Sequence, residues 1–141
     1  MKKLFYYFIF FLFILPGVGI NKLYSQQSSP RFSQIYNPTE VMVLYMFDHS
    51  WNEDSISTER FNAFINAPSQ LQLPLTDFVG AIIPKKVACF VIKTKNSSTL
   101  NTVEQKLKQK YPTANFRRAE VAELDNFIQM VGSGFKYNNQ N

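Results

Sequence analysis

The chain has 141 residues, with 15 Lys and Arg against 10 Asp and Glu, a single His and a single Cys. One Cys excludes an internal disulfide, and one Cys with one His excludes a structural zinc site made only of those ligands. The basic balance does not indicate nucleic-acid binding, because the first 25 residues hold three lysines and no acid, and without them the net charge falls from +5 to +2.

The N-terminus, residues 1–25, is predicted to be an export signal peptide. Two lysines precede an apolar run from Leu4 to Leu15, which a Pro-Gly pair ends. This run is shorter than the roughly 20 residues that span a membrane, although an uncleaved anchor reaching Ile20 is the alternative. Cleavage leaves 116 residues, enough for one domain with one core. We expect a bacterial protein that is periplasmic or secreted.

Residues 26–38 are polar, contain two prolines and show no period, so they predict a flexible tether. The domain, residues 39–134, opens with its strongest strand at 41–47. That stretch is apolar throughout, which indicates a central strand covered on both faces. A helix capped by Ser57 follows, and it should end near Ala67 because a proline comes next.

Two apolar runs, 78–83 and 87–94, are separated by Pro-Lys-Lys and predict a hairpin. Cys89 lies in the second run, and its apolar neighbours predict a small buried side chain. Four further segments are predicted: a helix capped by Ser98 or Thr99 and stopped by Pro112, a short strand at 114–118, a helix at 120–131 ended by Gly132, and a frayed polar tail at 135–141.

The order of these elements predicts the fold class. A β-α-β-β-α-β sequence with one more helix at its C-terminal end indicates a single small α+β domain of split βαβ, or ferredoxin-like, topology. The alternative is that residues 78–83 form a helix or a loop. Three strands would then remain, in a different α/β arrangement.

One cluster of polar functional groups follows the strongest strand: Asp48, His49, Glu53 and Asp54. Carboxylates and an imidazole can bind a divalent cation or perform acid–base chemistry. The segment lacks the glycine of a calcium loop, and the chain has neither a nucleophile elbow nor a phosphate-binding loop. Solvated side chains that bond to the turn backbone explain Asp48, Glu53 and Asp54 without a function, and this interpretation is preferred.

Three other residues are candidates for partner binding. Trp51 can anchor a partner or fold back over the end of the strand, and Arg117 and Arg118 can grip an acidic partner or simply belong to an exposed strand. The sequence predicts an exported, non-catalytic binding or accessory domain that contacts an envelope protein or polymer through a sheet face or a strand edge. It predicts no cofactor and no nucleic-acid partner. The alternative is a small metal-dependent or hydrolytic protein centred on His49 and its neighbouring carboxylates.

Mass spectrometry of the protein made in a bacterial host with its own leader should find a new N-terminus between Ile20 and Gln27. The reason is that the apolar run is short and is followed by helix-breaking residues. Recovery of the chain with Met1 intact in the membrane fraction would show that the leader is kept as an anchor.

Overall fold

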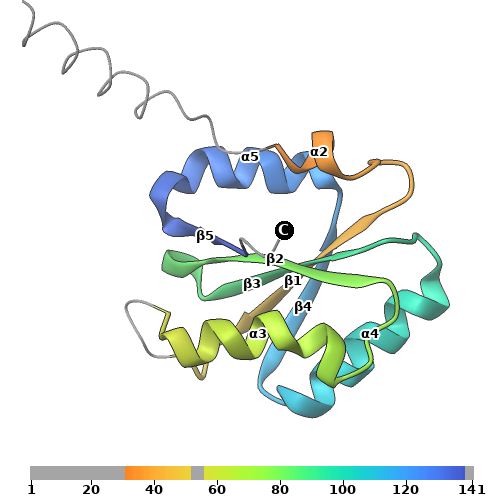
Figure 1. The fold of residues 1–141 in the computed structure, drawn as a ribbon, viewed down its shortest axis with the longest axis horizontal. Helices are drawn as coiled ribbons and strands as arrows, with labels where there is room; N and C mark the ends of the chain where they lie inside the picture. Colours follow the sequence, from red (N-terminus) through yellow and green to blue (C-terminus); the bar gives the residue numbers. More distant parts are fainter. Residues whose placement is uncertain (1–30, 52–55, 139–141) are drawn as a thin grey trace, which may run out of the picture. The chain divides into compact units, whose positions relative to one another are not determined.

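A computed structural model of the chain describes residues 31–51 and 56–138, and the predicted signal peptide lies outside them. These residues form a small α+β domain with a five-stranded antiparallel sheet and four helices (Figure 1). The strands are β1 (Met42–Asp48), β2 (Thr76–Ile82), β3 (Val87–Ile92), β4 (Ala114–Ala119) and β5 (Phe135–Tyr137). The helices are α2 (Phe32–Ile35), α3 (Thr58–Gln70), α4 (Ser97–Lys110) and α5 (Val121–Val131).

The sheet has the order β4-β1-β3-β2-β5, so β1 has a neighbour on each side. Tyr45 of β1 lies opposite Cys89 of β3 on one side and opposite Arg117 of β4 on the other. Residues 43–46 are almost completely buried, which confirms a central strand covered on both faces. Cys89 is buried in β3, also as predicted. No helix within the described ranges is long and apolar enough to cross a membrane.

Two separate cores fill the two faces of the sheet. Helices α3 and α4 cover one face, and α5 with α2 covers the other (Figure 1). Because side chains alternate along a strand, Leu44 and Met46 of β1 point to the first core, whereas Val43 and Tyr45 point to the second. Helices therefore cover the central strands on both faces, while β4 at the edge stays partly exposed. The expected contact of a partner through a sheet face or a strand edge stays a prediction.

Two helix ends differ from the predictions. Ser57 caps α3 as expected by accepting a hydrogen bond from the backbone N–H of Arg60 at 3.2 Å, but the helix continues through Pro68 to Gln70. Pro68 has no N–H to donate within the helix. The turn after it is closed by the N–H groups of Leu71 and Leu73, which donate to the carbonyls of Ala67 and Pro68 at 2.9 Å. Helix α4 is capped by Asn96, whose Oδ1 accepts from two backbone N–H groups at 2.9 and 3.2 Å.

The N-terminal part of the described chain is not a tether. Phe32, the first residue of α2, is only 5% exposed, and its backbone N–H donates to Asp125 Oδ1 of α5 at 2.6 Å. The N–H of Ser33 donates to the other carboxylate oxygen at 3.1 Å. A buried carboxylate that accepts two backbone donors ties a short helix firmly to its neighbour. The predicted tether is therefore corrected for residues 31–38.

The predicted frayed tail is corrected as well, because residues 135–137 form β5 and pair with β2. Phe135 is 5% exposed and lies against Gly80 of β2, where a Cβ atom would come within 2.4 Å of the Lys136 carbonyl oxygen and 2.5 Å of Phe135 Cζ. Gly80 also has φ +155°, which side chains disfavour. A glycine inside a strand marks a close approach of another backbone.

Gly80→Ala should therefore lower the free energy of unfolding by about 2 to 4 kcal/mol, because the new methyl group meets β5 and the backbone is strained. Gly132→Ala is the matched control. Gly132 has φ +53° and ψ −120°, where Ala is strained as well, but nothing lies within 4 Å of the added Cβ, so a loss of about 1 to 2 kcal/mol, smaller than at Gly80, is expected. Urea denaturation of both variants measures the difference. Equal losses would mean that β5 does not pack on Gly80.

Candidate functional site

Asp48 ends β1, is 5% exposed and connects two loops. Its Oδ1 accepts hydrogen bonds from the N–H and the hydroxyl of Ser50 at 3.0 and 2.7 Å, and from the hydroxyl of Thr113 at 2.9 Å. Burial by itself would raise the pKa of Asp48. The hydrogen bonds from Ser50 and Thr113, with the positive charge of Arg60, outweigh burial and hold the pKa below its usual range. Asp48 thus joins the turn after β1 to the loop before β4.

The other members of the predicted polar cluster are placed differently. His49 is exposed beside Asp48, and Glu53 and Asp54 lie outside the described residues. Within the described ranges, no group of three or more His, Cys, Asp and Glu side chains is close enough together to bind a metal ion. The metal or hydrolytic role of His49 stays a prediction.

Trp51 packs inward rather than outward. It is 1% exposed, its ring centroid lies 6.0 Å from that of Phe64, and the guanidinium of Arg60 lies 5.8 Å from the indole centroid. In this conformation Trp51 covers the end of the first core. Residues 52–55, which follow it directly, lie outside the described part of the chain, so no site is built on this loop.

The two arginines of β4 lie on opposite faces of the sheet. Arg117 forms a salt bridge with Glu123 of α5 and lies 4.9 Å from the ring centroid of Tyr45. Arg118 forms a salt bridge with Glu104 of α4 at 2.7 Å and also donates to Asn101. Both side chains already have partners in their own chain and attach helices to the sheet. An acidic ligand would have to compete with these carboxylates.

Cys89 lies between the two outer layers with no solvent exposure. Burial raises the pKa of its thiol far above the ordinary value, so the reactive thiolate is suppressed. Its surroundings are those of a core residue.

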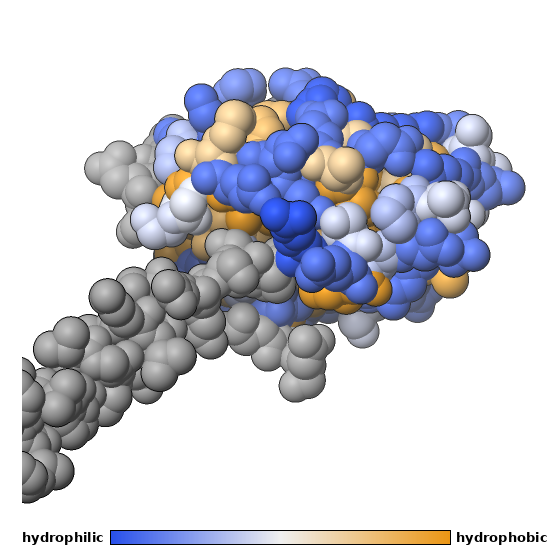
Figure 2. Space-filling view, turned by 90° about the horizontal axis from the view of Figure 1, so that it is seen from above, coloured by the Kyte–Doolittle hydropathy of each residue, from blue (hydrophilic) through white to orange (hydrophobic). Residues whose placement is uncertain are grey.

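Apolar residues on the surface over α5 are scattered and do not form one continuous patch. Seen from the side of α5 and α2, the described residues are mostly hydrophilic, and the hydrophobic areas between them are small and separate (Figure 2). The large hydrophobic residues found exposed in the described ranges, Ile35, Leu75 and Met130, belong to three different segments. Isolated apolar residues of this kind are usual on monomeric proteins.

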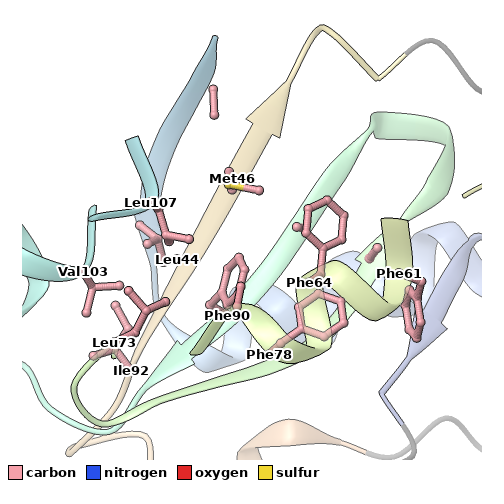
Figure 3. Close-up of a cluster of buried hydrophobic side chains, with 14 of the residues drawn as sticks. Leu44, Met46, Phe61, Phe64, Leu73, Phe78, Phe90, Ile92, Val103 and Leu107 are labelled. Carbon is pink, nitrogen blue, oxygen red and sulfur yellow. The ribbon is translucent and has the colours of Figure 1, made fainter. Parts of the chain in front are cut away.

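A concave surface lies between α3 and β5. This groove has a volume of about 490 Å³ and is lined by Phe61, Asn62 and Ile65 of α3 and by residues 135–138. Figure 3 shows Phe61 at the outer end of the first core, beyond Phe64 and Phe78. Its volume is in the range of small-ligand and peptide sites. The α3–β5 groove is the candidate site that the structure adds.

The chemistry of the α3–β5 groove is apolar with one cation. Lys136 Nζ lies 5.4 Å from the ring centroid of Phe61, Asn62 is exposed, and the Asn138 side chain donates to the carbonyl of Phe78 at 2.9 Å. None of the lining residues carries a carboxylate. Sequence reasoning missed the groove because it assigned residues 135–137 to a tail, although the Phe-Lys-Tyr alternation after a Gly-rich turn is a strand signal.

Comparison of the chain with protein-family models, with curated proteins and with solved structures found no match. The function is therefore inferred from the geometry of the described residues.

Asp48→Asn should destabilise the protein at pH 7 by about 1 to 2 kcal/mol, because charge-assisted hydrogen bonds are weakened. The pKa of Asp48 is lower in the folded than in the unfolded chain, so its contribution is complete above the unfolded pKa of about 3.9 and is lost as the pH falls through the folded value. Melting curves from pH 7 to pH 2.5 should show the variant and the wild type converging in acid. The exposed Glu40→Gln is the control, and a pH-independent gap for Asp48→Asn would contradict this account.

Proposed function

We propose that this chain is a non-catalytic binding domain that acts outside the cytoplasm and holds a partner in the α3–β5 groove. The observation that carries the proposal is a concave, largely apolar surface next to a strand at the edge of the sheet. Binding domains commonly use such edges, because backbone groups supply affinity and neighbouring pockets supply specificity.

The other candidate residues make contacts inside the domain, which leaves the groove as the candidate binding surface. Asp48 joins two loops, Trp51 closes a core, and Arg117 and Arg118 bind carboxylates of their own helices. Each has a structural role that accounts for its place. The alternative centred on His49 gains no support from the described geometry, where His49 is exposed.

We also infer a ferredoxin-like arrangement for the core of the fold. Its support is the βαββαβ order of β1-α3-β2-β3-α4-β4, the antiparallel neighbour order β4-β1-β3-β2, and the presence of α3 and α4 on one face. Helices α2 and α5 and strand β5 are additions to that pattern. This topology hosts many unrelated functions, so it names no partner, and the groove lies beside β5, which is one of the additions.

The export part of the proposal depends on the predicted leader, and it suggests an envelope protein or polymer as the partner. A protein partner is favoured over a polymer, because a strand edge presents backbone hydrogen-bonding groups that an extended peptide can match.

The proposal is tested by placing a photo-reactive amino acid at Asn62, on the wall of the groove, or at Gln109, an exposed position of α4. Living cells of the organism that makes the protein are irradiated. The Asn62 position should give a covalent adduct, identified by mass spectrometry, and the Gln109 position should give none. Adducts from Gln109 alone, or from neither position, would contradict binding at the groove.

A further inference from the structure

We propose that the α3–β5 groove binds an extended, acidic segment of a partner protein, which adds to the sheet as a strand beside β5 and places a carboxylate against Lys136. This inference rests on the proposed function and names the chemistry of the partner. The backbone edge of β5 and the charges around it support this inference.

The backbone of β5 has one side available for pairing. The N–H of Asn138 donates to the carbonyl of Val79 at 3.2 Å, and Tyr137 lies opposite Gly80. In an antiparallel pair, alternate residues direct their backbone groups toward the neighbouring strand. The N–H and carbonyl of Tyr137 therefore point away from β2, at the open edge of the sheet as far as it is described.

Phe135 adds an acceptor to this edge but not a donor. Its N–H already donates to the carbonyl of Gly132, whereas the alternation directs its carbonyl outward as for Tyr137. An incoming strand thus finds one donor and two acceptors, which matches a short stretch of extended peptide. The floor beside this edge is formed by Phe61 and Ile65, which suits one or two apolar side chains of that peptide.

The positive charge of Lys136 favours a partner segment that carries a carboxylate. The ammonium of Lys136 lies over the ring of Phe61, and it forms no salt bridge within the described residues. Other lysines of the domain, such as Lys110, also form no salt bridge within the described residues, but Lys136 is the cation that lines the groove. A carboxylate on the incoming strand would form a charge-assisted contact with Lys136. A basic strand would be repelled.

The opposite edge of the sheet is a weaker docking place. On β4, Arg117 and Arg118 are neutralised by glutamates, and Lys108 Nζ donates to the carbonyl of Ala114. A second copy of the chain is also disfavoured on β5. Antiparallel self-pairing centred on Lys136 would bring two ammonium groups directly opposite each other, which costs stability.

The test uses the full chain and three fluorescein-labelled nine-residue peptides with blocked ends. All three carry Val or Thr at alternate positions, and they carry Glu, Gln or Lys at the others. In fluorescence anisotropy the Glu peptide should bind roughly two- to fivefold more tightly than the Gln peptide, and the Lys peptide more weakly than both. The preference should shrink as salt is raised.

Variants identify the residue that sets the preference. Lys136→Met should make the Glu and Gln peptides equal, and Lys136→Glu should reverse the order of the Glu and Lys peptides. Lys110→Met, which removes an exposed lysine of α4 outside the groove, is the matched control and should leave the preference unchanged. Melting temperatures verify that each variant is folded.

Amide NMR spectra locate the peptide. Addition of the Glu peptide should shift the amide of Tyr137 more than that of Asn115 on β4. The proposal is overturned if no peptide binds, if Glu and Gln peptides bind equally to the wild type, if the larger shift is on β4, or if the chain forms a dimer through β5. The photo-reactive Asn62 position could give an adduct in cells while the wild type shows no preference for the Glu peptide. That result would contradict the acidic partner but not the proposed binding function.

Discussion

The burial of β1 on both faces is the constraint on which the rest of the structure depends. A strand whose side chains are apolar on both sides must be covered on both sides, since each exposed apolar face would cost hydrophobic free energy. Leu44 and Met46 require the layer made by α3 and α4, and Val43 and Tyr45 require the layer that contains α5. The three-layer arrangement follows from this one strand.

The two ends of the described chain complete the layer that contains α5. Asp125 holds the start of α2 through two backbone N–H groups, and Phe32 of that helix packs against Phe135 and Tyr137 of β5 at centroid distances of 6.2 and 6.1 Å. Gly80 makes room for β5 beside β2. Segments that are far apart in sequence thus stabilise one another, and the same packing creates the groove beside α3.

The contacts inside the domain occupy most of the residues that the sequence singled out. Residues that stand out in the sequence because they are polar or aromatic, such as Asp48, Trp51 and Arg118, have partners inside the domain. The proposed binding surface is assembled from α3 and β5, and it contains Lys136, which forms no salt bridge within the described residues. A site of this kind depends on shape and on an open strand edge more than on a motif.

Much of the fold was predictable from the sequence alone. The apolar run at 41–47, the hairpin around Pro84 and the helical stripes predicted the central strand, the buried Cys89 and an α+β domain, because these signals are local and periodic. The N-cap of α3 was predicted correctly at Ser57, but α3 ends three residues beyond the predicted Ala67. The cap of α4, Asn96, lies two or three residues before the predicted Ser98 or Thr99, because several capping residues stand in a row.

Only the tertiary structure decided the roles of the two ends and the place of the candidate site. Residues 31–38 and 135–137 are short and lack a strong period of their own, and their order comes from Asp125, Gly80 and the aromatic residues they meet. Such contacts join positions about 55 to 105 residues apart, so no local pattern predicts them. The sequence by itself determined which segments must be buried, and the packing of those segments determined which edge and which groove remained open.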